Sequence, residues 1–209
     1  MLQATGLRKI FDQMLGRIFI PPTLLESTEK KVLHLSDTPT TLYPAIQQLI
    51  SSLKPDVVIH TGDLADDIKL ENNPHLLAYY SRSIVPLLAA LENSQAEQLF
   101  IVPGNHDHVD VITQHIQKIE LLPEGSQLQI GCSTFGLAHR LKKLPQQAEF
   151  HLYGHNFRQP LHEQQDAHYL NGLNHIHVIL LPSNRIFKIS YPWSTNHDRR
   201  MTKNLPKTI

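Results

Sequence analysis

The sequence has little cysteine, no excess of charge of either sign and no long apolar run. Cys132 is the single cysteine among 209 residues, so an internal disulfide framework is excluded, and we expect a buried structural thiol in a reducing compartment. Basic and acidic residues number 19 each. This balance argues against a nucleic-acid-binding protein, which needs a basic excess to displace counterions. No apolar stretch is long enough to span a membrane, so we expect no transmembrane segment.

The N-terminal segment lacks the uninterrupted apolar region of a secretory signal. Charged residues break it at Arg8, Lys9, Asp12 and Arg17. We therefore expect a cytoplasmic protein. Residues 2–19 nevertheless predict an amphipathic helix, with apolar residues on one face at Leu7, Ile10, Phe11, Met14, Leu15 and Ile18. Such a face usually packs on the protein's own core. The alternatives are a membrane surface, a protein partner or a dimer.

The chain is long enough to bury one substantial core, and its 41% apolar and 18% charged residues are typical of a globular protein. The first part repeats a strand, a polar loop and a helix three times. We expect strands at 31–37, 57–61 and 99–102, and helices at 42–53, 74–92 and 109–121. Apolar strands that alternate with helices imply a parallel sheet covered on both faces.

From about residue 128 the pattern changes to strands joined by turns. We expect these strands at 128–132, 134–140, 149–155, 175–181 and 185–192. They predict a second, mixed or antiparallel sheet that shares a core with the first. The predicted organisation is an N-terminal helix and connector over 1–30, one domain over 31–192 and a C-terminal tail over 193–209.

Five of the predicted strands end in a residue able to bind a metal. These residues are Asp37, Asp63, Asn105, His139 and His155. In an open α/β sheet, ligands bind outside the carboxyl ends of the strands. One aspartate at such a place is explained by helix capping, but five strand ends of this kind are not. Oxygen and imidazole donors without thiolates suit manganese, iron or zinc.

These residues lie in segments that resemble, in chain order, the motifs of calcineurin-like metallophosphoesterases. The segments are SDTP (36–39), GDLAD (62–66), GNHD (104–107), LAHR (137–140) and GHNF (154–157). The family pattern is D-x-H, G-D-x-x-D, G-N-H-D/E, a lone H and G-H-x-H, and the resemblance covers roughly residues 31–192. It implies an α/β fold, a four-layer α/β/β/α sandwich of two mixed sheets flanked by helices, with two metal ions between the sheets.

The resemblance also implies a role for each residue. Asp63 would bridge both metals, whereas Asn105, His139 and His155 would complete one of them and Asp37 would begin the other. His106 would act as general acid toward the leaving group, and Asp66 would orient its ring. Two metals in such a site polarise a phosphoryl oxygen and activate a water for in-line attack.

Two departures from the family pattern affect the same metal. Pro39 and Phe157 stand where the pattern has histidines, and both of those histidines would serve the metal that Asp37 begins. We therefore predict one tight divalent-metal site and a doubtful second site.

Other histidines are weaker candidates for replacing the missing ligands. His34 and His60 lie three residues before the strand-end aspartates, and this odd offset points them to the opposite face of the sheet. We expect both to be core histidines. His175 and His177 share one face of a strand, which predicts a sheet surface.

Two functions follow from these observations. The favoured one is a metal-dependent hydrolase of phosphate monoesters or diesters, because His106, Asp66 and every ligand of the tight site are kept. Its substrate would be a small phosphorylated molecule, chosen by loops near residues 67–75 and 156–174. The alternative is a catalytically impaired protein of this fold that acts as a metal-binding or protein-interaction scaffold. The paired loss at Pro39 and Phe157 and the amphipathic N-terminal helix support it.

Overall fold

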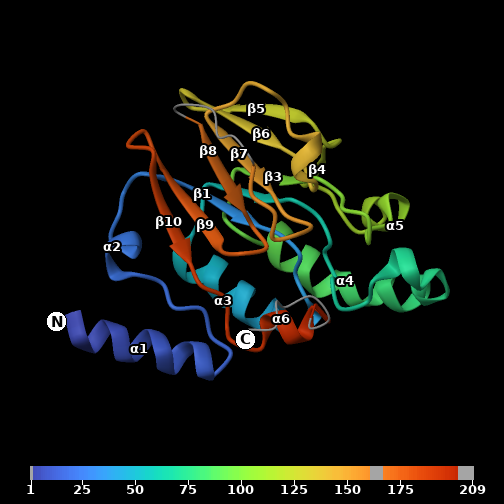
Figure 1. Ribbon diagram of the computed structural model, residues 1–209, viewed down its shortest axis with the longest axis horizontal. Helices are drawn as coiled ribbons and strands as arrows, with labels where there is room; N and C mark the ends of the chain where they lie inside the picture. The colour runs from blue at the N-terminus through green and yellow to red at the C-terminus, as the bar shows by residue number, and fades with distance from the viewer. Residues whose placement is uncertain (1, 161–166, 202–209) are drawn as a thin grey trace.

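Two β-sheets stacked on one another form the body of the protein, in a computed structural model that describes residues 2–160 and 167–201 (Figure 1). The larger sheet has the strand order β10-β9-β1-β2-β3-β4. Strands β1 to β4 are parallel, whereas β9 and β10 run antiparallel to their neighbours. The strands are β1 (Lys30–Leu35), β2 (Val57–His60), β3 (Gln98–Ile101), β4 (Glu120–Leu121), β9 (Ile176–Leu181) and β10 (Arg185–Ile189).

The second sheet has four strands in the order β5-β6-β7-β8. The β5–β6 pair is antiparallel, and β6, β7 and β8 are parallel to one another. The strands are β5 (Ser126–Ile130), β6 (Ser133–Leu137), β7 (Phe150–Tyr153) and β8 (His168–Asn171). The strand β8 is absent from the sequence-based prediction.

Alternating residues of the larger sheet build two separate cores. On β1, Leu33 packs with Ile46 and other side chains of the helix layer, whereas Val32 points to the second sheet and packs with Phe135 and Phe150. The helix layer consists of α3 (Tyr43–Leu53) and α4 (Leu77–Glu92), which lie beneath the larger sheet in Figure 1. This arrangement buries the parallel strands on both faces.

The outer face of the second sheet is covered by the segment that contains η4 (Leu141–Lys143), a single 3-10 turn. A Cβ placed at Gly136 of β6 would lie 2.7 Å from Cγ of Pro145 and 3.1 Å from Cβ of Ala148, so this segment sits directly on the sheet. The prediction of two mixed sheets flanked by helices is confirmed.

The remaining helices are short or lie at the ends of the described chain. They are α1 (Leu2–Met14), α2 (Pro22–Leu25), α5 (Val109–Thr113), α6 (Thr195–Asp198) and the 3-10 turns η1 (Thr40–Leu42), η2 (Leu70–Asn72) and η3 (Pro74–Leu76). In the described part of the chain, no helix combines the length and apolar character needed to cross a membrane.

Two expected helices differ from those observed. The helix predicted over 109–121 ends at Thr113, because the carboxylate of Glu92 on α4 accepts the backbone N–H groups of Gln117, Lys118 and Ile119 at 2.8 to 3.1 Å. The chain then pairs with β3 as β4.

The N-terminal helix is also shorter than predicted. Of its predicted apolar face, Ile18 packs against the core, but the other five residues do not. Leu7, Ile10, Phe11, Met14 and Leu15 are between 47% and 70% exposed.

The predicted burial of four residues outside the metal cluster is confirmed for two of them and wrong for the other two. His34 and His60 are buried core histidines, as predicted, at 2.9 Å from the hydroxyl of Thr61 and 2.7 Å from that of Thr38, respectively. His177 was expected on a sheet surface, but it is buried and its ring stacks on His34, with centroids 5.5 Å apart. Cys132 was expected to be buried, and it is exposed.

Candidate metal centre

Three of the expected metal ligands have an unusual backbone conformation. The φ angles of Asp37, Asp63 and His155 are 51°, 58° and 70°, in the left-handed region that residues with a Cβ rarely adopt. Each follows the end of a strand, namely β1, β2 or β7. Such strain persists only where the surrounding structure enforces it, and it concentrates at functional sites.

Glycines let the strand-end loops approach one another closely. A Cβ at Gly104 would lie 2.3 Å from Oδ1 of Asp63, and a Cβ at Gly154 would lie 2.2 Å from Oδ2 of Asp37. Real Cβ atoms do not approach other atoms so closely, so both positions require glycine in this arrangement. The glycines of the GNHD and GHNF segments therefore bring the carboxylates of one loop against the backbone of the next.

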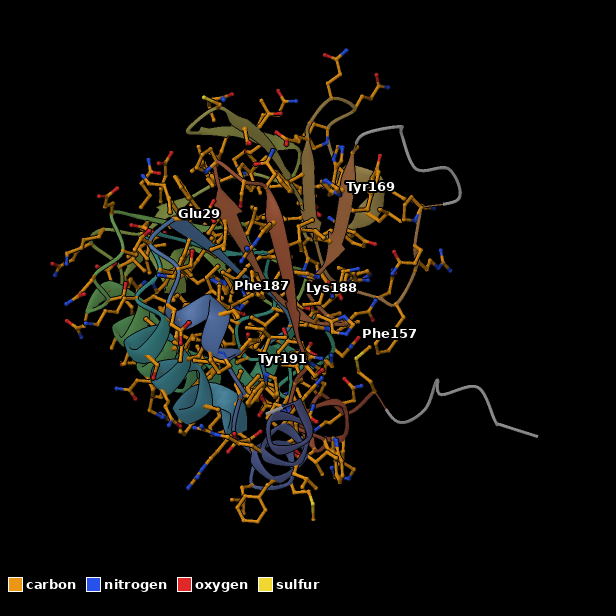
Figure 2. The ribbon with its side chains drawn as sticks, turned by 90° about the vertical axis from the view of Figure 1, so that its left-hand side faces the viewer. Glu29, Phe157, Tyr169, Phe187, Lys188 and Tyr191 are labelled. Carbon is orange, nitrogen blue, oxygen red and sulfur yellow. The ribbon has the colours of Figure 1, made fainter. Side chains whose placement is uncertain are left out.

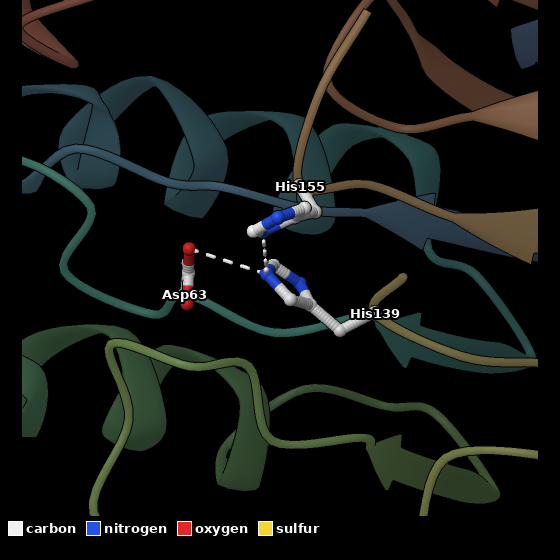
Figure 3. Close-up of side chains that lie close together, drawn as sticks. All are labelled: Asp63, His139 and His155. Carbon is white, nitrogen blue, oxygen red and sulfur yellow. Dashed lines mark hydrogen bonds and ion pairs between the residues drawn. The ribbon is translucent and has the colours of Figure 1, made fainter. Parts of the chain in front are cut away.

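Side chains from three strand ends converge on the imidazole of His139. Its Nε2 atom lies 3.3 Å from Oδ2 of Asp63 and 3.2 Å from Nδ1 of His155 (Figure 3). The same atom lies 3.1 Å from Oδ1 of Asn105. Asp63 and His139 are buried, and His155 is half-buried. Four predicted ligands of one metal thus meet at a single point between the two sheets.

The orientation of these side chains fits a bound cation. Nδ1 of His139 lies 2.7 Å from the backbone oxygen of Thr61, which only accepts, so Nδ1 carries a proton and the neutral ring offers its lone pair at Nε2. Asn105 donates its amide to Glu71 at 2.6 Å, which turns its Oδ1 toward His139. In the neutral ring this lone pair faces the oxygens of Asp63 and Asn105, so a cation beside Nε2, a proton or a metal ion, relieves their repulsion. The nitrogen and oxygen donors suit a divalent transition metal.

The electrostatics of the pair at the centre favour positive charge there. Burial by itself would lower the pKa of His139, but the carboxylates of Asp63 and then Asp37, with the hydrogen bond to Thr61, together raise this pKa to about 10. Burial would likewise raise the pKa of Asp63, but His139 and then His106 hold that pKa well below its usual value. A positive charge is thus stabilised beside Nε2 of His139, whether a proton or a metal ion supplies it.

A second group, formed by Asp63, Asp66 and His106, lies beside the first. One potential ligand atom from each lies within 4.8 Å of the others, and all three residues are buried. Burial and then the charges of Asp37 and Asp63 raise the pKa of Asp66 to about 7. Burial lowers the pKa of His106, partly offset by Asp63.

No hydrogen bond joins Asp66 to His106 in the described part of the chain. Asp66 pairs through Oδ1 with the ammonium of Lys69, and its Oδ2 is buried without a hydrogen-bond partner. Nδ1 of His106 also lacks such a partner and lies 3.9 Å from Oε2 of Glu71. The backbone N–H of His106 donates to Oδ1 of Asp63 at 2.9 Å, which holds the residue at the cluster.

Asp37 lies close to the cluster, yet its carboxylate belongs to neither of the two groups that the described residues form. It accepts the hydroxyl of Ser36 at 2.6 Å and the backbone N–H of His155 at 3.1 Å. Pro39 is buried beside it, whereas Phe157 is 43% exposed and points to the surface (Figure 2). Asp37 therefore fixes the backbone that presents His155.

Residues 161–166 of the predicted specificity loop at 156–174, and residues 202–209 of the predicted tail, lie outside the described residues.

The structure adds residues to which the sequence analysis gave no role. Asp107 accepts the backbone N–H groups of Asp63, Leu64 and Gly104 at 2.7 to 2.8 Å and the hydroxyl of Tyr80 at 2.8 Å. It ties the loop after β2 to the loop after β3.

Lys69 and Glu71, from the 67–75 loop, also lie at the site. Their charges, three and five residues after Asp66, were the sequence signal that could have predicted a role for them.

Comparisons with known proteins agree with this architecture. A family model described as calcineurin-like phosphoesterase matches residues 30–207. A solved archaeal phosphodiesterase is 16% identical with a TM-score of 0.53, covering 77% of this chain and 99% of its own. The E. coli phosphoesterase Yfce is 14% identical with a TM-score of 0.50, covering 78% of this chain and 99% of its own. At these identities the likeness establishes the fold alone. No curated protein matches the chain significantly.

Proposed function

The chain belongs to the calcineurin-like phosphoesterase family, and from this premise we propose that it is a metal-dependent hydrolase of phosphate monoesters or diesters. The observation that carries the proposal is the convergence of Asp63, Asn105, His139 and His155 on one point. Two imidazoles, a carboxylate and an amide oxygen are a donor set that suits a divalent metal ion.

The protein's own residues have distinct parts in the proposed reaction. A divalent ion held by the four ligands would polarise a phosphoryl oxygen and lower the pKa of a water molecule. His106 lies next to this centre, and its ring is 10% exposed. A bound phosphate ester would favour the protonated ring, since a nearby anion raises the pKa of a histidine. His106 would then donate its proton to the leaving oxygen.

We propose manganese, iron or zinc as the ion, bound at one tight site, and a cytoplasmic location. The donors are two imidazole nitrogens, one carboxylate and one amide oxygen, which suit all three metals. The reducing compartment is supported by the single cysteine, Cys132. Small phosphorylated molecules are the proposed substrates, since the neutral net charge gives no general attraction to nucleic acid.

A second candidate function is an interaction scaffold, and the helix α1 favours it. Five apolar side chains of residues 7–15 are roughly half or more exposed, although they form one helical face. Such a face fits a protein partner or a second copy of the chain. The paired replacement of histidines at Pro39 and Phe157 also fits a protein in which activity has been reduced.

Turnover assays separate the two candidates. We expect hydrolysis of p-nitrophenyl phosphate or its diester with added Mn²⁺, and loss of that hydrolysis in His106→Ala. The variant His115→Ala is the matched control, because His115 is an exposed histidine outside the site and outside both predicted substrate loops. Absence of turnover across metals and pH would contradict the hydrolase. A monomer–dimer change or loss of a defined partner on deleting residues 1–20 would then support the scaffold.

A further inference from the structure

Two carboxylates of the second group of potential ligands, and that of Asp37 nearby, are buried. Asp37, Asp63 and Asp66 are each at most 2% exposed. Potential ligand atoms of Asp63 and Asp66 lie within 4.8 Å of one another, so their charges interact. Buried carboxylates are costly unless a cation or hydrogen-bond donors compensate them. A metal ion bound at His139 would neutralise the charge of Asp63. The charge of Asp66 would still need a second positive charge.

Lys69 supplies a positive charge at this place. Its ammonium pairs with Oδ1 of Asp66, and its side chain is only 23% exposed although it is a lysine. An ammonium thus lies against the Asp63–Asp66–His106 group, the three residues whose ligand atoms lie within 4.8 Å of one another.

The backbone directs Lys69 into the site. Its φ of 52° and ψ of 54° place it in the left-handed region, and the residues on either side, Ile68 and Leu70, are buried in the core. The amide of Asn73 donates to the carbonyl oxygens of Ile68 at 3.3 Å and Lys69 at 3.1 Å. The lysine is therefore held by a fixed turn, unlike a surface lysine whose charge moves freely in solvent.

The group around Lys69 still has the features of a cation site. Oδ2 of Asp66 and Nδ1 of His106 are both buried without a hydrogen-bond partner. Asp66 is 1% exposed, so its free oxygen is shielded from bulk solvent. Pro39 and Phe157 stand where the family pattern has histidines for the metal that Asp37 begins, so a second ion held by Asp37 and Asp63 would have few protein ligands. A lysine ammonium needs no metal ligands to stay at this place, because it is covalently attached to the chain.

We propose that the ammonium of Lys69 takes the place of a second divalent ion at the Asp63–Asp66–His106 group. The proposal rests on the proposed function, in which one ion is bound at His139. The protein then holds one exchangeable ion and one built-in positive charge. Both would face a phosphate ester, and the charge of Lys69 stays in place at any metal concentration.

The number of bound ions tests this proposal without any activity assay. After removal of metals, the full chain is equilibrated with Mn²⁺ alone, and the bound metal is counted by mass spectrometry and titration calorimetry. We expect one ion in the wild type and one in Lys69→Arg, which keeps the charge. We expect a second, weaker ion in Lys69→Met, and its loss again in the double variant Lys69→Met, Asp66→Asn.

A matched lysine controls for general charge effects. Lys30 pairs with the exposed Glu97 at 3.2 Å, away from the site, so Lys30→Met should bind one ion like the wild type. Lys69→Gln replaces Lys69→Met if the latter fails to fold, as judged by circular dichroism. Two ions in the wild type, or an unchanged number of ions in the uncharged Lys69 variant, would overturn the proposal.

The outcome is distinguishable from failure of the proposed function. If the wild type binds one ion and catalyses nothing, the hydrolase is contradicted and the ion counts still decide the role of Lys69. If the wild type binds no ion, the metal centre at His139 is contradicted. The gain of an ion in Lys69→Met would then still support the replacement of an ion by the ammonium, and no gain would overturn it.

Discussion

The imidazole of His139 donates from Nδ1 to the backbone oxygen of Thr61 at 2.7 Å. Thr61 directly follows β2, so the sheet itself orients this ring and leaves Nε2 free for the cluster. Metal-binding histidines commonly donate their second nitrogen to such a partner, which fixes the tautomer and the direction of the lone pair. The site is therefore organised by the fold before any ion binds.

Glu71 should matter for metal affinity without being a ligand. It holds the amide of Asn105 at 2.6 Å and so directs the oxygen of that amide toward His139. We expect Glu71→Ala to weaken Mn²⁺ binding by about 10–100-fold, as loss of a partner of a ligand does. Glu71→Gln, which can still accept this hydrogen bond, should lose less. The exposed Glu97 provides the control variant Glu97→Ala. Equal affinities of wild type and Glu71→Ala in calorimetry would refute this role.

Gly104 should tolerate no side chain. A Cβ there would lie 2.3 Å from Oδ1 of Asp63 and 2.7 Å from its backbone nitrogen, so Gly104→Ala must displace the metal ligand. We expect destabilisation by about 1–3 kcal/mol, as overpacking typically produces, together with weaker Mn²⁺ binding. The control is Gly6→Ala in α1, where nothing lies within 4 Å of the added Cβ. Thermal unfolding with and without Mn²⁺ measures both effects, and a Gly104→Ala variant as stable as Gly6→Ala would be inconsistent with this packing.

His177 should make the protein less stable as the pH falls. Burial, and then the charges of His175 and Lys188, lower its pKa from 6.5 to about 3. Below pH 6.5 the unfolded chain takes up a proton that the folded protein does not. The contribution of His177 to the free energy of unfolding is therefore fully present above pH 6.5. It decreases as the pH falls toward 3, by up to about 1.4 kcal/mol per pH unit.

The variant His177→Phe keeps an aromatic ring against His34 and removes the titration. Its stability, from urea unfolding between pH 7.5 and 4.5, should decline less steeply than that of the wild type. The exposed-site variant His75→Gln should follow the wild type. Parallel curves for the wild type and His177→Phe would show that His177 does not titrate in this way.

Arg199 should contribute to stability far more than its neighbour Arg200. The buried guanidinium donates to the backbone oxygens of Asp37 at 2.6 Å and Leu173 at 2.9 Å, and it lies 4.3 Å from the ring centre of Tyr191. A lysine cannot reproduce this planar set of donors. We expect Arg199→Lys to cost about 1–3 kcal/mol because buried acceptors lose their partners. Arg200→Lys, at an exposed position, should cost little. Similar unfolding temperatures for the two variants would contradict this assignment.

The strand-end ligands could be predicted because their signals are local. An apolar run followed by Asp63 or Asn105 identifies both a strand and its carboxyl end, and parallel strands bring such ends together. The helix expected at 109–121 failed for the opposite reason. Its apolar spacing is helical, but the carboxylate of Glu92, far away in sequence, captures the backbone N–H groups that would continue the helix.

Other features depend on long-range contacts that the sequence does not display. The strand β8 is short and has little apolar character, and its position comes from pairing with β7. Arg199 reaches the site from the predicted tail, and its burial depends on carbonyl groups of loops after β1 and β8. The contact of Lys69 with Asp66 is local, three residues apart, but the sequence does not show the left-handed turn that brings the ammonium to the cluster. The domain boundaries predicted at residues 30 and 192 stay a prediction.

The central claim is that one divalent ion binds at the point where Asp63, Asn105, His139 and His155 meet. Anomalous diffraction from crystals of the full chain grown with Mn²⁺ tests it most directly. We predict one strong anomalous peak within bonding distance of Nε2 of His139 and Oδ2 of Asp63, and none beside the ammonium of Lys69. Absence of a peak at His139, with Mn²⁺ present in the crystal, would contradict the account.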